Sequence, residues 1–280
     1  MPELPDLLYV VGRLREALGG RVVSAERVKE PVVLRFTVRG NLSLLLGRAL
    51  EDVLRKSHFV VFRFPGFDLA VNPMLAGRFR LGAAGEKDEG TLAFALGFGE
   101  TELRYLDDKK MGKAYLIANG DWKAIPGMQT GGIDVLSPEF TRERFLSLLK
   151  HRRDQVRAFL LDKKALDSIG NAYADEILFD ARIHPKTWCR SLSRDDAVRL
   201  HDAIVSVMQA AVAEVAERGE PIEVKVRDFL KVRNRHGAPC PRCGAKIRKA
   251  GVHGHDAFYC PECQPDGRAS ALVDFRRAKT

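Results

Sequence analysis

The N-terminus brings together an amine and a carboxylate that can do chemistry. Methionine is removed from starts such as Met1-Pro2, because proline is small, and Pro2 then presents a secondary α-amine. The pKa of such an amine is about 8, so a useful fraction is unprotonated at neutral pH. The amine can form a covalent intermediate of the Schiff-base type, and Glu3 beside it can transfer protons. Pro2 taken alone is equally compatible with an inert terminal residue.

Four cysteines near the C-terminus have the spacing of metal ligands. Cys240 and Cys243 form one CxxC pair, and Cys260 and Cys263 form a second pair after sixteen intervening residues. Each pair lets two thiolates reach one ion, so the sequence predicts one Zn²⁺ in a closed tetrahedral site, with a hairpin between the pairs. Because no coordination position stays open, the expected role of the zinc is structural.

The predicted hairpin is basic. Its Lys, Arg and His residues are Lys246, Arg248, Lys249, His253 and His255. A basic hairpin held rigid by zinc suits contact with phosphates, although a zinc ribbon can also bind other proteins.

Residues 162–176 contain a further motif, in which Gly170-Asn171 separates two helical stretches. Such a turn exposes backbone N–H groups at the start of the next helix, where the helix dipole favours a phosphate. Asn171 is therefore a candidate phosphate contact, and Lys163 is a further candidate DNA-binding residue. The alternative is an ordinary connection between two helices.

The elements that must position these residues fall into two groups. A helix is predicted over residues 5–18, before Gly19-Gly20. Short β-branched and aromatic runs then predict strands at 31–38, 59–64, 68–72, 91–98 and 102–106, which together indicate an antiparallel β-sandwich. After a glycine-rich linker, helical patterns begin after Thr141, at Gln155 and, with a capping box, at Ser193.

Composition and charge narrow the classes of function. The 280 residues are 45% apolar and 30% charged, which suits two modest globular domains. Lys and Arg outnumber Asp and Glu by 46 to 37, and the net charge of +9 favours a polyanionic partner. No apolar run has the length of a membrane helix, and the start lacks the basic region of a secretory signal. We therefore expect no membrane partner.

Three motifs occur in the order of one known family: MPELPD at the start, IGNAYADEILFDARIHP in the middle, and CPRC with FYCPECQ near the end. The chain resembles the formamidopyrimidine-DNA glycosylase and endonuclease VIII family, from about Pro2 to Gln264. This resemblance implies an α+β fold with an N-terminal catalytic β-sandwich (residues 1–130) and a helix–two-turns–helix DNA-binding domain (131–232). A zinc finger (233–265) and a basic tail (266–280) follow, and DNA binds in the cleft between domains.

The resemblance also implies a base-excision-repair DNA glycosylase with abasic-site lyase activity. In the family, the N-terminal proline attacks C1′ of a flipped damaged nucleotide and a glutamate assists, roles that fall here to Pro2 and Glu3. Asp6 stands where the family usually has a second glutamate. The expected partner is double-stranded DNA with a damaged base or an abasic site. We expect a monomer, located in the cytoplasm and associated with the nucleoid.

Several positions that contact DNA in the family are changed here. The lysine that contacts a phosphate and assists catalysis is matched by His58, which is a weaker phosphate ligand because a neutral histidine carries no charge. Lys56 lies two residues earlier and, on an extended strand, faces the same side, so it is a candidate substitute. The DNA-contacting arginine of the finger is matched by His255, and binding at that phosphate should weaken.

The residues that fill the space left by a flipped base also differ. A Met, an Arg and a Phe of the family are matched by Leu75, Lys109 and Met111. An ammonium group cannot reproduce the guanidinium fork that reads the opposite base, and Met111 is a flexible wedge. Residues 229–240 form a shorter stretch than the loop that covers the lesion in glycosylases specific for oxidised guanine. An altered lesion preference is predicted.

Two other functions stay open. The loss of several contact residues at once is typical of a DNA-binding paralogue with little or no glycosylase activity. A zinc-ribbon protein that binds other proteins is a third interpretation, which the match over the whole chain disfavours. The retained Pro2-Glu3 pair, the Asn171 motif and the four cysteines favour the active enzyme.

Overall fold

The computed structural model describes residues 2–29, 34–36, 41–87, 90–126, 128, 131–167, 169–252 and 254–266, with the backbone alone for 34–36. By their contacts, the residues group into two compact units: Met1–Thr130 with Val212–Val226, and Gly131–Ala211 with Arg227–Thr280. Residues 212–226, assigned from sequence to the helical domain, thus make their contacts in the first unit. Among the described helices, none combines the length and the apolarity needed to cross a membrane.

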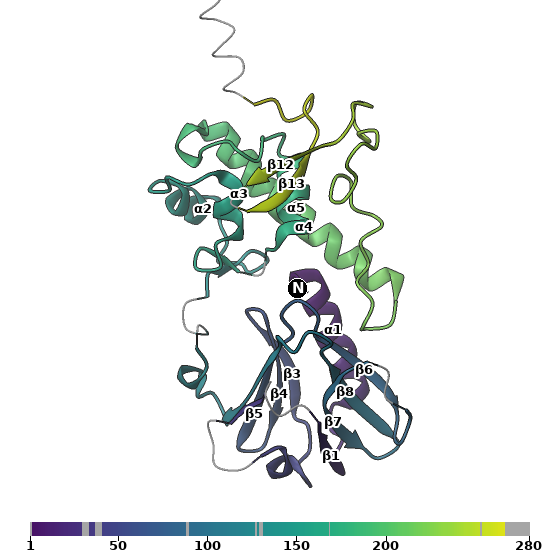
Figure 1. Cartoon of the computed structure of the whole chain (residues 1–280). Coiled ribbons are helices and arrows are strands. Elements are labelled where there is room, and N and C mark those ends of the chain that lie inside the picture. The colour runs from purple at the N-terminus through teal and green to yellow at the C-terminus, as the bar shows by residue number, and fades with distance from the viewer. Residues whose placement is uncertain are drawn as a thin grey trace, which may run out of the picture. The chain divides into compact units, whose positions relative to one another are not determined.

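The first unit begins with helix α1 (Leu4–Leu18), as predicted (Figure 1). Proline at the second position of the helix suits this end, because the first N–H groups of a helix have no partner within it. The Asp6 carboxylate accepts a hydrogen bond of 2.8 Å from the backbone N–H of Glu3. This bond closes the start of the helix. The apolar side of α1 is buried and packs against β3 (Asp52–Lys56) and β4 (Phe59–Phe64).

Two sheets form the rest of this unit. The first has the strand order β2-β9-β5-β4-β3 and is antiparallel except for the parallel pair β2 and β9. Its remaining strands are β2 (Leu34–Phe36), β5 (Phe67–Asn72) and β9 (Lys113–Ala118). The second sheet is antiparallel, with the order β1-β7-β8-β6. Its strands are β1 (Ala25–Val28), β6 (Arg78–Ala83), β7 (Leu92–Phe98) and β8 (Thr101–Leu106).

One apolar core lies between the two sheets and α1. Fully buried members include Phe62 and Leu69 from the first sheet, Phe94 and Leu103 from the second, and Leu14 from α1. The predicted β-sandwich with its N-terminal helix is confirmed. Residues 31–33 and 37–38 of the first predicted strand lie outside the described residues. The sequence did not predict the edge strands β1, β3 and β6. Charged side chains are common at sheet edges, and they interrupt the apolar pattern of these strands. Strand β9 was also not predicted.

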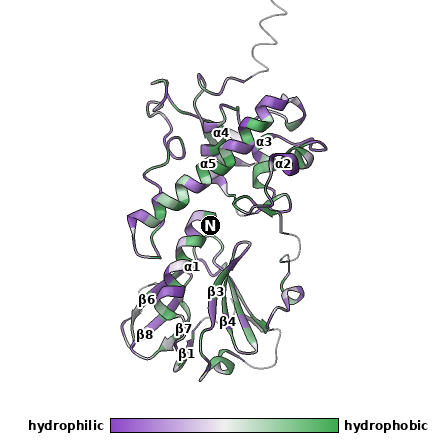
Figure 2. Cartoon of the chain, turned by 180° about the vertical axis from the view of Figure 1, so that it is seen from behind, coloured by the Kyte–Doolittle hydropathy of each residue, from purple (hydrophilic) through white to green (hydrophobic). Residues whose placement is uncertain are grey.

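The second unit contains the predicted helices. They are α2 (Arg142–Leu149), α3 (Val156–Leu161), α4 (Asn171–Asp180) and α5 (Arg194–Arg218), whose last residues belong to the first unit. Ser193 and Asp196 form the predicted capping box: the Ser193 Oγ accepts from the Asp196 N–H at 3.0 Å and the Asp196 carboxylate accepts from the Ser193 N–H at 3.1 Å. In Figure 2, hydrophobic and hydrophilic residues alternate along α5, as expected for an amphipathic helix.

Short elements complete the fold. Strand β10 (Ile133–Asp134) pairs in parallel with β11 (Leu166–Asp167). The 3₁₀ turns are η2 (Leu42–Leu45), η3 (Trp122–Ala124) and η5 (Cys189–Ser191). The predicted finger hairpin is present as the antiparallel strands β12 (Arg248–Val252) and β13 (His255–Tyr259). His253 and residues 267–280, which include most of the predicted basic tail, lie outside the described residues.

Candidate active site and nucleic-acid interface

Pro2 and Glu3 lie where the chain enters α1. Both residues are buried, and Glu3, only 6% exposed, occupies the N-cap position. The positive end of the helix dipole favours a carboxylate at this place. Asp6, which replaces the second glutamate of the resembled family, binds the backbone N–H of Glu3. Asp6 therefore holds the backbone directly beside the candidate nucleophile.

Pro2 lines a cavity within the first unit. Its walls come from α1, β4, the start of β6 and residues 222–225, and the space left between them is about 30 Å³. Two cationic residues, Arg78 and Lys225, are among the lining residues. The Nζ of Lys225 donates a hydrogen bond of 3.5 Å to the carbonyl oxygen of Leu75. Asp6 and Glu223 also line the cavity, and Arg78 is paired with Asp108 at 2.6 Å, so Lys225 is the cation that suits a phosphate there.

Three loops with candidate residues meet at one end of the five-stranded sheet. Val60 pairs with Val71 in β5, and Asn72 at the end of β5 pairs with Lys113 at the start of β9. This register places the β3–β4 turn, which contains His58, beside residues 73–77 and residues 107–112. Leu75 lies on the second of these loops, and Lys109 and Met111 lie on the third. Leu75 is 51% exposed and Met111 is 40% exposed, as a side chain that enters a base stack must be.

The loop of residues 107–112 is built around a buried carboxylate. Asp107, 1% exposed, accepts hydrogen bonds from the backbone N–H groups of Gly112 at 2.6 Å and Lys109 at 3.3 Å. Beneath the loop lies Tyr105, whose buried hydroxyl has no hydrogen-bond partner in the described part of the chain. A Cβ added at Gly112 would lie 1.9 Å from this hydroxyl, and one added at Gly77 would lie 2.2 Å from it. The two glycines let both loops approach the same tyrosine.

The structure does not place Lys56 where the sequence analysis expected it. Lys56 and His58 were expected on the same side of one extended strand, but Lys56 ends β3 and His58 lies in the two-residue turn before β4. Lys56 pairs with Phe59, and its Nζ lies 5.1 Å from the centre of the Trp122 ring. Phe59 faces one side of the sheet, so the next residue, Val60, which lines the Pro2 cavity, faces the other. Lys56 therefore lies on the face of the sheet away from the Pro2 cavity, and His58 contacts Phe59 with the two ring centres 4.7 Å apart. His58 is half-buried beside Ser57.

In the second unit, Asn171 takes part in a buried polar network. Asn171 is the first residue of α4, and its Oδ1 accepts a hydrogen bond of 3.0 Å from Arg157. Arg157 is fully buried and forms an ion pair of 2.8 Å with Asp175, which is also fully buried. The Nη1 of Arg157 has no hydrogen-bond partner among the described residues.

The same network reaches the finger hairpin. The carbonyl oxygen of Asp256 accepts hydrogen bonds from Arg157 at 3.1 Å and from Arg233 at 3.0 Å. His255 is exposed and precedes this residue on β13. The structure therefore links the start of α4 to the strand that carries His255. Lys163 lies in the turn between α3 and β11, where its carbonyl oxygen accepts from the Gly132 N–H at 2.7 Å.

Sequence reasoning missed the residues that hold this arrangement. Asp175 also accepts from Arg233 at 2.7 Å, and the Glu176 carboxylate accepts three hydrogen bonds from the backbone of residues 231–233. A signal was available, because two consecutive acids in an otherwise apolar helix such as α4 must be paired if they are buried. Their partners are distant in the sequence, and only the tertiary structure identifies them.

The four predicted zinc ligands converge on one point. Their sulfur atoms all lie within 4.8 Å of one another, with Cys243 and Cys260 3.4 Å apart and Cys240 and Cys263 3.9 Å apart. Zinc–sulfur bonds of about 2.3 Å in a tetrahedron give edges of about 3.8 Å, so the cysteines fit a Zn²⁺ ion. Backbone N–H groups of Arg242 and Cys263 point at two of the sulfurs, which stabilises thiolates.

Comparisons with protein families cover most of the chain. Residues 1–114 match the formamidopyrimidine-DNA glycosylase N-terminal domain, and residues 132–219 match the formamidopyrimidine-DNA glycosylase H2TH domain. Residues 237–265 match the zinc finger found in FPG and IleRS. These matches confirm the predicted fold class and the predicted zinc site.

Individual relatives extend over the whole chain. The formamidopyrimidine-DNA glycosylase of Cytobacillus firmus is 32% identical over 282 residues, which are 94% of this chain and 100% of the relative. That of Symbiobacterium thermophilum is 33% identical over 288 residues, covering 100% of this chain and 94% of the relative. Among solved structures, a complex between Lactococcus lactis Fpg and DNA with an abasic site gives a TM-score of 0.86 at 25% identity. A complex of the same wild-type protein with DNA containing an oxidised pyrimidine gives 0.85 at 26%. Both comparisons cover 95% of this chain and 100% of the Lactococcus lactis chain.

Proposed function

Because the chain belongs to the formamidopyrimidine-DNA glycosylase family, whose members are bifunctional DNA glycosylases and abasic-site lyases, we propose that it repairs damaged double-stranded DNA through Pro2. The observation that carries this proposal is the buried N-terminal Pro2, which lines a cavity together with Lys225 and adjoins Glu3 at the N-cap of α1. The preferred lesion is one other than oxidised guanine, as the changes at Leu75, Lys109 and Met111 indicate.

The reaction uses the Pro2 nitrogen as the nucleophile once Met1 is removed. The nitrogen forms a bond to C1′ of the damaged nucleotide, and the bond from C1′ to the base breaks, so that the base leaves with the electron pair. Opening of the sugar ring yields an iminium between Pro2 and C1′. Loss of a proton from C2′ then expels the 3′ phosphate. Glu3 is the nearest carboxylate in the sequence to transfer these protons.

The DNA duplex is held by groups of both units. In the second unit, the backbone N–H groups at the start of α4 and the Asn171 side chain supply donors for a backbone phosphate. Lys163 and the exposed His255 add further contacts. In the first unit, Leu75, Lys109 and Met111 enter the space of the flipped nucleotide. Lys109 has one ammonium group in place of a guanidinium fork, so discrimination of the opposite base is weaker.

Lys225 takes the place of the lysine that is absent at position 58. It lines the Pro2 cavity, whereas Lys56 lies over Trp122 on the opposite face of the sheet. A lysine near the nucleophile attracts the phosphate of the reacting nucleotide and stabilises its charge as it leaves.

Borohydride trapping tests the proposal. Protein that mass spectrometry shows to lack Met1 is incubated with labelled duplexes containing an abasic site, an oxidised pyrimidine or an oxidised guanine, and reduced. We expect a covalent adduct at the N-terminal peptide. Pro2→Gly should lose most of the adduct, because it changes the nucleophile. Equal trapping by Pro2→Gly would assign the attack to another amine.

The simultaneous changes at His58, Lys109 and His255 favour a second candidate, a DNA-binding paralogue without glycosylase activity. Zinc-loaded protein without Met1 that binds damaged duplex but forms no adduct with any of the three substrates would establish this alternative.

A further inference from the structure

The Tyr105 hydroxyl is a buried hydrogen-bond donor without an acceptor. Tyr105 lies on β8 and is fully buried in the sandwich core, and its hydroxyl has no hydrogen-bond partner within the described residues. Burial, together with the nearby charge of Asp107, raises the pKa of this hydroxyl, so it stays protonated at neutral pH. Most buried polar groups in proteins are paired, because an unpaired one destabilises the fold. An unpaired donor in this place therefore needs an explanation.

Two acceptors lie close to this hydroxyl, one on each of the two loops that carry Leu75, Lys109 and Met111. These loops, residues 73–77 and 107–112, are called the wedge loops below. A Cβ added at Gly77 would overlap both the Tyr105 hydroxyl and the carbonyl oxygen of Pro73, and one added at Gly112 would lie against both the hydroxyl and the Asp107 carboxylate.

Both acceptors already accept a hydrogen bond from their own loop. The Pro73 carbonyl oxygen accepts from the Gly77 N–H at 2.8 Å, and the Asp107 carboxylate accepts from the Gly112 N–H at 2.6 Å. A carbonyl or carboxylate oxygen has two lone pairs and can accept a second bond. A small shift of either loop would therefore bring a free lone pair to the Tyr105 hydroxyl.

The wedge loops each contain a strained residue that favours such a shift. Met74, next to Leu75, has a φ of 50°, and Lys110, next to Met111, has a φ of 51°. Residues with a side chain rarely adopt this left-handed region, because the Cβ approaches the following carbonyl oxygen. Strain of this kind is common in segments that change conformation when they bind a ligand.

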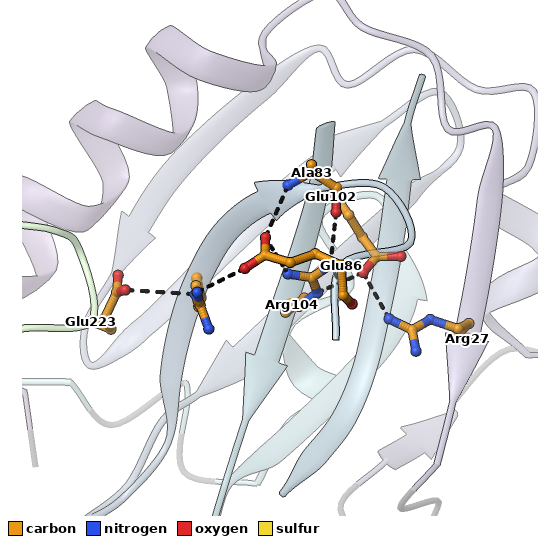
Figure 3. A network of polar contacts seen from close by, with 7 residues as sticks. Arg27, Ala83, Glu86, Glu102, Arg104 and Glu223 are labelled. Carbon is orange, nitrogen blue, oxygen red and sulfur yellow. Dashed lines mark hydrogen bonds and ion pairs between the residues drawn. The ribbon is translucent and has the colours of Figure 1, made fainter. Parts of the chain in front are cut away.

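Tyr105 itself is held in place from the opposite face of β8 (Figure 3). The preceding residue, Arg104, points to that face and is 1% exposed. Its guanidinium donates to Glu102 at 2.7 Å, to Glu86 at 3.1 Å and to the carbonyl oxygen of Ala83 at 2.8 Å. The dashed lines of Figure 3 mark these contacts. Because this network anchors β8, a new hydrogen bond to Tyr105 requires the loops to move and not the tyrosine.

We propose that Tyr105 is a positioning residue for base flipping: when the loop of residues 107–112 shifts on damaged DNA, the Tyr105 hydroxyl donates to the Asp107 carboxylate and holds Met111 in the base stack. The carboxylate is the acceptor, and not the Pro73 carbonyl oxygen, because hydrogen bonds to a charged group are stronger. This inference rests on the proposed function, since the wedge loops serve the same enzyme. Tyr105 acts on the reaction only through the position of Met111.

Tyr105→Phe tests the proposal, because it removes only the hydroxyl. In DNA-free protein the Tm should be unchanged or higher, since the lost group has no partner there. On a duplex with an abasic site, the fluorescence of 2-aminopurine placed opposite the lesion reports insertion of the wedge. The equilibrium constant for this fluorescence change should fall about tenfold, as expected for loss of a hydrogen bond to a charged group.

Tyr115→Phe is the matched control. Tyr115 loses the same hydroxyl, but it is buried in a separate cluster on the other face of the five-stranded sheet. The variant should give the fluorescence change of wild type. An equal loss in Tyr115→Phe would assign the effect to the stability of the sheet and would overturn the proposal.

A double-mutant cycle separates a positioning role from a structural one. If Tyr105 acts through Met111, Tyr105→Phe should have little further effect in a Met111→Ala background. A tenfold effect in both backgrounds, a lower Tm of DNA-free Tyr105→Phe, or an unchanged fluorescence signal in that variant would each contradict the proposal. Absence of covalent trapping by wild type contradicts the proposed function instead, because the fluorescence signal does not depend on the chemistry of Pro2 and still decides the role of Tyr105.

Discussion

At the scale of single residues, two glycines decide the shape of the loops that carry Leu75, Lys109 and Met111. Gly77 and Gly112 both lie against the Tyr105 hydroxyl, where no Cβ fits. Neither requires a left-handed backbone, so the constraint is close packing and not conformation. Because Tyr105 is buried in the sandwich core, the loops are supported by the fold of the whole unit.

Gly112→Ala should destabilise the protein by about 1–3 kcal/mol, the usual range for overpacking a buried site. It should also reduce trapping on damaged duplex, because the loop of residues 107–112 must shift. Gly12→Ala is the matched control: Gly12 lies within α1 with open space around its Cα, and alanine there should stabilise by about 1 kcal/mol. Thermal unfolding of both variants measures the difference, and an unchanged Tm for Gly112→Ala would contradict the packing argument.

A second prediction at this scale concerns Lys225 and Lys56. Lys225→Ala should lower the rate of trapping on an abasic duplex about tenfold. It should also reduce the slope of log K for DNA binding against log salt concentration by about one, the contribution of one phosphate contact. Lys225→Arg should restore the salt dependence. Lys56→Ala, on the opposite face of the sheet, should change neither. Loss of activity in Lys56→Ala with retention in Lys225→Ala would reverse the assignment.

At the scale of elements, α3, α4 and the finger hairpin are joined by one buried carboxylate. Asp175 pairs with Arg157 and with Arg233, and accepts a hydrogen bond of 3.2 Å from the Phe258 N–H on β13. Arg157 and Asp175 are both fully buried, so water cannot solvate either charge if the other is removed. The start of α4 and the hairpin are therefore positioned together.

Asp175→Asn should destabilise the second unit by about 3–5 kcal/mol, because it leaves buried guanidinium groups without a counter-charge. Asp202→Asn is the control, since the Arg142–Asp202 pair is exposed, and exposed pairs contribute about 0–1 kcal/mol. Denaturant unfolding compares the two. Similar losses in both variants would show that burial is not the deciding factor.

The polar network of Arg80, Glu86 and Arg104 in the second sheet predicts a pH dependence. The Arg104 hydrogen bond holds the pKa of Glu86 below its ordinary value of 4.5. A carboxyl whose pKa is lowered by folding stabilises the protein above its unfolded value, and this contribution is lost as the pH falls through the lower folded pKa. Wild type should therefore unfold at a higher temperature than Glu86→Gln at about pH 6, and the two unfolding temperatures should converge as the pH falls through the lowered pKa of Glu86. A constant difference down to acidic pH would contradict this linkage.

At the scale of the whole molecule, zinc connects folding to DNA binding. The finger has a small core, formed by Val232, Ile247, Phe258 and two of the cysteines, with Phe179 of α4. Such a small hairpin depends on its metal for stability. The Gln264 side chain adds a buried link, accepting from the Cys260 N–H and donating to the Ile183 carbonyl oxygen, both at 2.9 Å.

Removal of zinc by a chelator should release one ion per chain, expose four thiols to a thiol reagent and weaken DNA binding. The fifth cysteine, Cys189, should react slowly, because it is buried and burial raises the pKa of its thiol to about 12. Metal analysis, thiol titration and DNA-binding measurements before and after chelation check the three parts. Full DNA affinity after complete loss of zinc would show that the finger is dispensable.

The sequence by itself determined the family, the β-sandwich, the main helices and the zinc ligands. These depend on local periodicity, on cap residues such as Ser193 and Asp196, and on the spacing of four cysteines, all of which act over a few residues along the chain. Only the tertiary structure decided that Lys56 faces away from Pro2, that Lys225 lies beside it, and that Arg157 joins Asn171 to the hairpin. The physical reason is that these placements depend on which strands pair and on which distant charges are buried together, and neither is encoded in local spacing.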